Sequence, residues 1–137
     1  MTVKSPSLPI GPISPAAAGP LYQQIITAVT REIASGRLAP GHPLPSFRAL
    51  AEELQVSLIT VKRAYEELER AGVIYRRQGL GTFIAENGGG AARQAQRTLA
   101  REAMRHAVAL GRDSGLAEEE IVQLLREELR GKQGEKR

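Results

Sequence analysis

Residues 46–72 read SFRALAEELQVSLITVKRAYEELERAG, and they carry the strongest indication of the fold. Ser46 is placed to cap a short helix through Leu54, because a serine side chain accepts a hydrogen bond from a free amide of the first turn. The inward face of this helix would be Phe47, Leu50, Ala51 and Leu54. Ser57 is placed to cap a second helix that runs to about Ala71, with Gly72 as its left-handed terminator. Two capped helices with a tight turn between them predict a helix-turn-helix.

An amphipathic helix is expected before this stretch, from Pro20 to the stop at Gly36. The fixed φ of proline suits a first helical position. The apolar side chains recur at helical spacing, namely Tyr22, Ile25, Ile26, Val29 and Ile33. Residues 38–45 contain three prolines and one glycine, so they predict an extended connector.

Two runs of β-branched and aromatic residues follow, at 73–78 and 82–85, and Gly79-Leu-Gly81 separates them. This pattern predicts a β-hairpin. Three helices and a hairpin in this order predict a winged helix-turn-helix domain over residues 20–86. The expected fold class is mainly α with a small β-hairpin, followed by a two-helix C-terminal tail.

The remaining segments are expected to surround this domain. Residues 1–19 carry prolines at positions 6, 9, 12 and 15, the period of a polyproline II helix, and predict a disordered arm. Docking of this arm into an aromatic groove is the alternative. Residues 87–91 predict a glycine-rich linker, residues 92–131 a helical region, and residues 132–137 a charged disordered tail.

The helical region contains two apolar stripes, within about 92–110 and 117–130, that carry no aromatic side chain. Such stripes are too small for a core of their own, so burial against a second copy of the chain is expected. Packing back onto the winged domain is the alternative. The predicted dimerisation residues are Leu99, Ala103, Ala107, Leu110, Ile121, Leu124, Leu125 and Leu129.

Composition excludes several classes of function. The 137 residues include no cysteine, which excludes disulfides, a thiolate nucleophile and Cys-type zinc sites. No continuous apolar run reaches 18 residues, so we expect a cytoplasmic protein without a membrane span. His42, His106 and Asp113 are the only residues of their types and lie far apart in sequence, so we predict no catalytic triad, metal site or cofactor. The net charge of +4 is compatible with nucleic acid but does not indicate it.

The second helix of the motif offers one exposed side. At about 100° per residue, Val61 and its neighbours face inward, and Ile59 lies at the centre of the opposite side with Leu58 on its flank. An exposed isoleucine alone is ordinary on a protein surface. Beside Thr60, Lys62 and Arg63 at a helix N-terminus, it could instead touch a thymine methyl group while the cations hold phosphates.

Several motifs together resemble the GntR family of bacterial transcription regulators. They are LPSFRALA at 44–51, VS at 56–57, TV at 60–61, AY at 64–65, LE at 68–69, GVI at 72–74 and GLGTF at 79–83. Gly111 and the run LAEEEI at 116–121 resemble the short tail of the YtrA subfamily, whose members have a small helical dimerisation region.

This resemblance implies how the chain would contact DNA. It implies that Arg48 contacts the backbone, that residues 57–62 enter the major groove, and that the tip at 79–81 reaches toward the minor groove. Arg76 and Arg77 alternate faces of the hairpin, so at most one of them points at phosphate. The predicted DNA-binding residues are Arg48, Ser57, Leu58, Ile59, Thr60, Lys62, Arg63, Arg77, Gly79 and Gly81.

The chain departs from the family pattern at four places. Leu58 stands where the family often has arginine, which favours an operator that is rich in A·T pairs or read by shape. His42 replaces a usual acid, and Phe47 replaces a residue that is commonly polar or acidic. Ala117 stands where a capping serine is usual, which weakens the start of the last helix.

The expected function is that of a homodimeric regulator without enzymatic activity, most simply a repressor bound to an inverted-repeat operator. The resemblance further implies control of its own operon, often one that encodes an ABC transporter. A small-molecule effector between the tail helices is a further expectation. The alternative is a winged helix that binds another protein through Leu58 and Ile59 without contacting DNA, and a hydrolytic enzyme is a third class.

Overall fold

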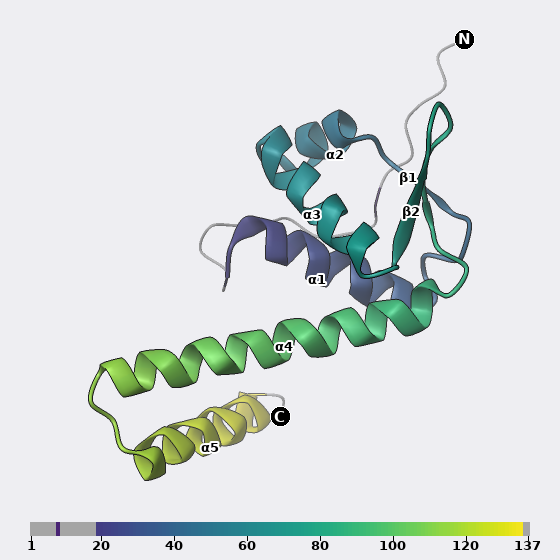
Figure 1. Ribbon diagram of the computed structural model, residues 1–137. Helices are drawn as coiled ribbons and strands as arrows, with labels where there is room; N and C mark the ends of the chain where they lie inside the picture. The colour runs from purple at the N-terminus through teal and green to yellow at the C-terminus, as the bar shows by residue number, and fades with distance from the viewer. Residues whose placement is uncertain (1–7, 9–18, 136–137) are drawn as a thin grey trace. The chain divides into compact units, whose positions relative to one another are not determined.

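The computed structural model describes residue 8 and residues 19–135. Its elements are α1 (Leu21–Ala34), β1 (Pro43–Leu44), α2 (Phe47–Leu54), α3 (Leu58–Arg70), β2 (Ile74–Arg77), β3 (Gly81–Ile84), α4 (Gly88–Asp113) and α5 (Glu118–Glu135) (Figure 1). They form a mainly helical winged helix-turn-helix with two C-terminal helices, which confirms the predicted fold class. The chain divides into two compact units whose boundary lies within α4, after Leu99. We call the first unit the winged domain and the second unit the tail.

Both predicted helix caps of the helix-turn-helix are present. The Ser46 hydroxyl accepts a hydrogen bond from the Ala49 amide at 3.1 Å, and the Ser57 hydroxyl accepts one from the Thr60 amide at 3.2 Å. Gly72 has a φ of +79°, as predicted for a left-handed terminator. Pro20 is the N-cap of α1 and precedes its first helical residue by one position.

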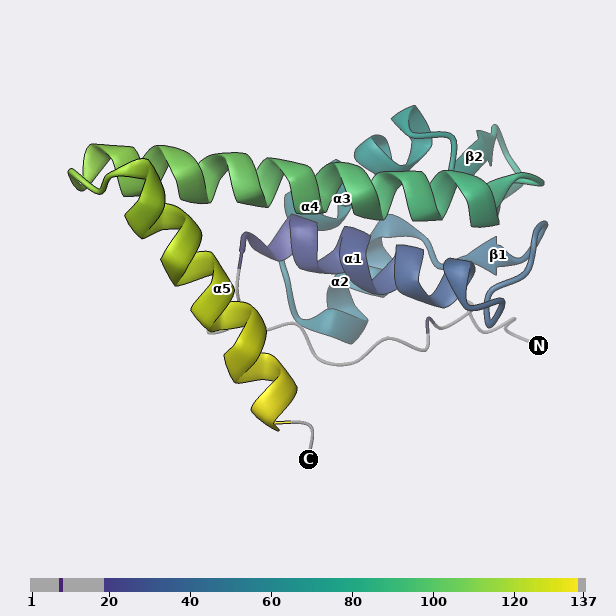
Figure 2. The ribbon, with the colours of Figure 1, turned by 90° about the horizontal axis from the view of Figure 1, so that it is seen from below.

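The core of the winged domain lies where α1 and α2 pack against α3 (Figures 1 and 2). Tyr65 is its largest fully buried side chain. Its hydroxyl donates a hydrogen bond to the Pro45 carbonyl at 2.8 Å, and its ring meets the Phe47 ring edge-on with centroids 5.2 Å apart. Burial, with a smaller contribution from the negative charge of Glu53, raises the pKa of the Tyr65 hydroxyl well above its usual value of 10. These contacts hold α3 against the start of α2.

The predicted hairpin is part of a three-stranded antiparallel sheet in the order β1-β3-β2. Pro43 pairs with Phe83 and Leu44 with Thr82, while β2 and β3 pair from Ile74↔Ile84 to Arg77↔Gly81. The prediction of an extended connector over residues 38–45 did not include β1. A two-residue strand shows no alternation, and Pro43 is tolerated only because it begins an edge strand.

The predicted linker at 87–91 is wrong, because α4 begins at Gly88. Gly88 is buried, and a Cβ atom there would lie 2.9 Å from Ile84 Cγ2 and 3.3 Å from the Val73 carbonyl oxygen. Glycine serves close packing at this point and not flexibility. Leu99, which we predicted to be a dimerisation residue, is half-buried against the core of the winged domain.

The ends of the chain differ from prediction where they are described. Residues 1–7 and 9–18 of the predicted arm lie outside the described residues, whereas Leu8 is buried in the core of the winged domain. The helix α5 continues to Glu135, so the predicted disordered tail is wrong for residues 132–135. Lys132 and Gln133 are good helix formers, which lets α5 continue past Gly131. In the described part of the chain, none of the helices is long and apolar enough to cross a membrane.

The tail is a helical hairpin closed by a tight contact. A Cβ atom at Gly111 in α4 would lie 3.0 Å from Ile121 Cδ1 in α5, so glycine permits this approach. Ala117 precedes α5, and its amide donates to the Glu120 carboxylate at 3.0 Å, which is one half of a capping box. Glu118, Glu119 and Glu120 occupy the first turn of α5, where the helix dipole favours acidic residues.

Candidate nucleic-acid interface

The exposed side of α3 carries the apolar residues that we predicted to touch bases. Ile59 is 77% exposed and Leu58 is 45% exposed, whereas Val61 and Leu68 on the opposite side are fully buried. A buried inner side fixes the rotation of the helix about its axis. Ile59 therefore points away from the domain, as predicted, and its side chain is available to a partner.

The N-terminus of α3 presents two hydroxyl groups. The Ser57 and Thr60 hydroxyls lie 2.7 Å apart and share a hydrogen bond, and the Ser57 oxygen also accepts from the Thr60 amide. Each hydroxyl keeps further hydrogen-bonding capacity toward solvent, since a hydroxyl can donate once and accept twice. Such groups beside the positive end of a helix dipole are suited to phosphate oxygens.

Ion pairs divide the arginines and lysine of the interface into two groups. Arg70 pairs with Glu67 at 2.7 Å, and Arg76 pairs with Glu69 at 3.6 Å. Within the described residues, no ion pair is formed by the four cations that we predicted to contact DNA, namely Arg48, Lys62, Arg63 and Arg77. All four are exposed. Among the described cations of α2, α3 and the wing, those without an ion pair are therefore the predicted contact residues.

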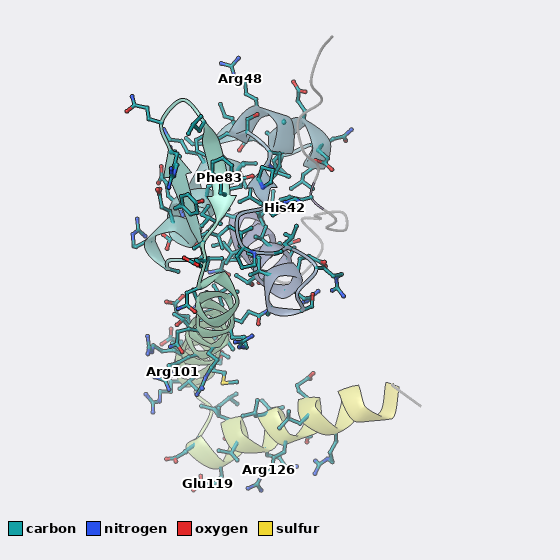
Figure 3. The ribbon with its side chains drawn as sticks, turned by 90° about the vertical axis from the view of Figure 1, so that its right-hand side faces the viewer. His42, Arg48, Phe83, Arg101, Glu119 and Arg126 are labelled. Carbon is teal, nitrogen blue, oxygen red and sulfur yellow. The ribbon has the colours of Figure 1, made fainter. Side chains whose placement is uncertain are left out.

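Arg48 supplies the cation of α2. Figure 3 shows its side chain projecting outward from α2, at the end of the winged domain where the wing tip also lies. The Phe47 ring beside it is engaged with Tyr65 and with the Arg76 guanidinium, whose Cζ lies 4.9 Å from the ring centroid. Phe47, which replaces a commonly polar residue, thus links α2, α3 and the wing.

The wing separates its two arginines as predicted. Arg76 faces α2 and α3, whereas Arg77 lies on the other face, where its Cζ is 5.8 Å from the Tyr75 ring centroid. Gly79 and Gly81 have φ of +78° and +119°, which explains the glycines at the tip. Between them Leu80 is 71% exposed. Leu80 was not among the predicted DNA-binding residues, although its place between the two tip glycines was the available signal.

Tyr22, which its spacing assigned to the core face of α1, contacts one of the predicted DNA-binding residues. Its ring is half-buried, and the Arg63 guanidinium of α3 lies over it with Cζ 4.0 Å from the centroid. Arg63 Nη2 also donates to the Tyr22 hydroxyl at 3.3 Å. The side chain of Arg63, a predicted DNA-contact residue of α3, is therefore held directly by α1.

The residues considered for catalysis or metal binding are His42, His106 and Asp113. No group of three or more His, Asp or Glu side chains that could hold a metal occurs in residue 8 or residues 19–135. The His42 ring nitrogen Nδ1 lies 2.8 Å from the Pro43 carbonyl oxygen, a local contact. His106 and Asp113 lie on α4 in the tail.

The tail leaves a set of large apolar side chains exposed, namely Met104, Leu110, Val122, Leu124, Leu125 and Leu129. Of the predicted dimerisation residues, Ala103 and Ala107 are also exposed, and Ile121 is half-buried near Gly111. Met104 and Val122 were not predicted. A hollow of about 530 Å³ in the tail is lined by Leu116, Glu119, Glu120, Gln123 and Leu124.

Comparisons with known proteins agree with this geometry. Residues 21–84 match the family described as bacterial regulatory proteins, gntR family. The HTH-type transcriptional repressor YtrA of Bacillus subtilis (strain 168) is 32% identical over 115 residues, which cover 84% of this chain and 88% of that protein. A solved transcriptional antiterminator from Listeria monocytogenes EGD-e is 32% identical, with a TM-score of 0.59 over 88% of this chain and 90% of its own. YtrA from Sulfolobus acidocaldarius, a GntR-family transcription factor, is 32% identical, with a TM-score of 0.53 over 68% of this chain and 95% of its own.

Proposed function

The chain belongs to the GntR family of bacterial regulatory proteins, and from this premise we propose that it is a repressor that binds an inverted-repeat operator as a homodimer. Membership makes it a DNA-binding transcriptional regulator, similar to YtrA, and not an enzyme. Repression, the symmetry of the operator and the dimer go beyond membership. Each rests on the physical arguments below.

The observation that carries the proposal is the exposed side of α3. An apolar residue, Ile59, is flanked there by two cations, Lys62 and Arg63, that form no ion pair with any described residue. Cations bind phosphates without regard to sequence, whereas an apolar side chain in the major groove distinguishes thymine by its methyl group. One helix side thus combines affinity with base selectivity.

The other predicted contact residues extend this surface. Arg48 and Arg77 would hold phosphates on either side of α3, and Ser57 and Thr60 would donate hydrogen bonds at its N-terminus. Leu58 would support Ile59 against the bases. Gly79 and Gly81 would let the wing backbone approach the minor groove closely, with Leu80 at the tip.

The tail supports the homodimer. Its exposed apolar side chains form no core of their own, and burial against a second copy would remove them from water. One winged domain contacts a single half-site, and linking two copies raises the overall affinity through effective concentration. Two-fold symmetry of the dimer implies an inverted repeat in the operator.

Repression would follow from occupancy of a promoter by this dimer in the cytoplasm. Two relatives, YtrA and NagR of Bacillus subtilis, are named repressors, which supports this sign of regulation. We extend the proposal to control of the chain's own operon, including ABC transporter genes where these are present. The effector would be a small molecule bound in the tail, where the hollow on α5 offers a place.

Selection from a random duplex library tests the proposal. The purified chain is expected to enrich duplexes with two half-sites in inverted orientation, about one helical turn apart. Binding should weaken steeply with salt because phosphate contacts release counterions. The opposite outcome is that the chain enriches no sequence and that its association with other proteins is insensitive to salt. That outcome would support the alternative, in which Leu58 and Ile59 bind another protein.

A reporter gene behind the chain's own upstream DNA tests the sign of regulation. Repression predicts higher expression when the gene is deleted and lower expression when it is restored. The Arg48→Ala variant, which should fold but bind DNA weakly, serves as the control and is expected to behave like the deletion. Lower expression on deletion would contradict repression.

A further inference from the structure

Arg63 has two carboxylates within reach on its own helix. Glu66 and Glu67 follow it by three and four residues, the spacings at which opposite charges pair along a helix. The side chain forms neither pair in the structure, since Glu67 bonds to Arg70 and Arg63 lies over Tyr22. A pair with either glutamate would cancel the positive charge on the side of α3 that faces the proposed DNA.

Tyr22 holds the guanidinium by two different contacts. The ring face attracts the cation at 4.0 Å from the centroid, and the phenol oxygen accepts one guanidinium N–H at 3.3 Å. The same oxygen accepts a hydrogen bond at 3.4 Å from Nε2 of Gln23, the next residue of α1. A guanidinium has five N–H donors in a fixed fork, so most of them stay available to an anion.

The contact between Tyr22 and Arg63 lies on the side of α3 that is proposed to face DNA. Arg63 follows Ile59 by four residues, so both lie along the exposed side of α3. A long side chain loses rotamer freedom when it binds a phosphate, and a side chain that is already held loses less. The neighbouring Lys62 has no comparable support among the described residues, because no ring contact or hydrogen bond of its side chain is found there.

We propose that Tyr22 is a positioning residue of the DNA interface, whose ring keeps the Arg63 guanidinium clear of Glu66 and Glu67 and presents it to a phosphate oxygen. The proposal rests on the proposed function, because it requires that α3 faces DNA. In this proposal α1 contributes to DNA binding through Arg63, without a residue of its own that reads bases.

A double-mutant cycle between Tyr22 and Arg63 tests this role. Kd is measured by fluorescence anisotropy on a selected duplex at several salt concentrations for Tyr22→Leu, Arg63→Gln and the double variant. Arg63→Gln should weaken binding about tenfold and reduce the slope of log K against log salt by about 1, because one phosphate contact is lost. Tyr22→Leu should weaken binding about threefold to tenfold and shift the slope toward that of Arg63→Gln. The double variant should match Arg63→Gln alone.

Two further variants sharpen the test. Tyr22→Phe keeps the ring and should lose less affinity than Tyr22→Leu, about threefold at most. Lys62→Gln is the matched control, because Lys62 lies on the same side of α3 without touching Tyr22. Its effect should add to that of Tyr22→Leu without coupling.

Thermal unfolding checks that each variant is folded at the temperature of the titrations, and the double-mutant cycle then separates positioning from stabilisation of the domain. If Tyr22 only stabilised the winged domain, Tyr22→Leu would weaken binding by the same factor with or without Arg63, and that additivity would overturn the inference. An unchanged Kd for Tyr22→Leu would overturn it as well. If the natural chain itself bound no duplex, the proposed function would fail first, which distinguishes the two failures.

Discussion

Arg76 and Arg77 are neighbours in sequence, but their side chains lie on opposite faces of the wing and make different contacts. Arg76 pairs with Glu69 and lies over Phe47, whereas Arg77 lies over the Tyr75 ring on the other face of the wing, with Cζ 5.8 Å from the centroid. The alternation of a β-strand alone produces this difference. Substitution of each arginine should therefore give a different phenotype.

We expect Arg77→Gln to weaken DNA binding and to reduce the salt slope of log K by about 1, since a phosphate contact is lost. Arg76→Gln is the matched control. It should leave the slope unchanged and lower the free energy of unfolding by about 1 kcal/mol, because a partly exposed ion pair and one cation–π contact are lost. Anisotropy titrations and urea unfolding measure both. An equal change of slope for the two variants would contradict this assignment.

The proposed contact of Ile59 with thymine makes a prediction about the DNA. Replacing each operator thymine in turn by uracil removes only the 5-methyl group, and at one position this should weaken binding about threefold. The Ile59→Ala variant should bind both duplexes equally at that position. A natural chain that ignores uracil at all positions would argue against base recognition by Ile59.

Among the elements, the junction between β3 and α4 depends on one glycine. Gly88→Ala should lower the free energy of unfolding by about 1–3 kcal/mol, because the added methyl group would overlap Ile84 and approach the Val73 carbonyl. Gly89→Ala is the control, since its Cβ would make only an ordinary contact with Arg93. Its stability should be unchanged or higher by up to about 1 kcal/mol. Chemical denaturation that finds the two variants equal would refute close packing at Gly88.

The raised pKa of Tyr65 leads to a prediction of how the stability of the winged domain depends on pH. Its hydroxyl has a raised pKa in the folded protein, so the unfolded chain loses the proton first. The contribution of the protonated Tyr65 hydroxyl to the free energy of unfolding is fully present below about pH 10 and is lost as the pH rises above 10. Tyr65→Phe should flatten this decline, measured by urea unfolding between pH 8 and 11, and should cost about 1 kcal/mol at pH 8 for the unpaired Pro45 carbonyl. A decline as steep as that of the natural chain would contradict the assignment.

These elements show what local sequence can predict. The caps at Ser46 and Ser57 were predictable because a cap depends on groups three residues apart. The role of Gly88 was not, because Ile84 and Val73 impose it from elsewhere in the fold. The position of Ile59 followed from helical periodicity, whereas the contact of Tyr22 with Arg63 joins residues 41 positions apart that no local pattern connects.

For the molecule as a whole, binding to two half-sites at once requires association through the tail. Leu125→Lys should shift the chain toward monomer and weaken operator binding, because it places a charge among the exposed apolar side chains. Gln123→Lys adds the same charge on α5 without removing an apolar group, and it should leave the dimer largely intact. Sedimentation equilibrium at micromolar concentration compares the two. A monomeric natural chain would contradict the proposed homodimer.

Hydroxyl-radical footprinting of the chain on a selected duplex tests whether two copies present α3 to paired half-sites. If they do, we expect two protected segments related by two-fold symmetry, with centres about one helical turn apart. The protection at both segments should fade together when Lys62→Gln or Arg48→Ala replaces the natural chain, and this result would support the proposed interface. A single protected segment, or protection that no substitution on α2 or α3 alters, would contradict it.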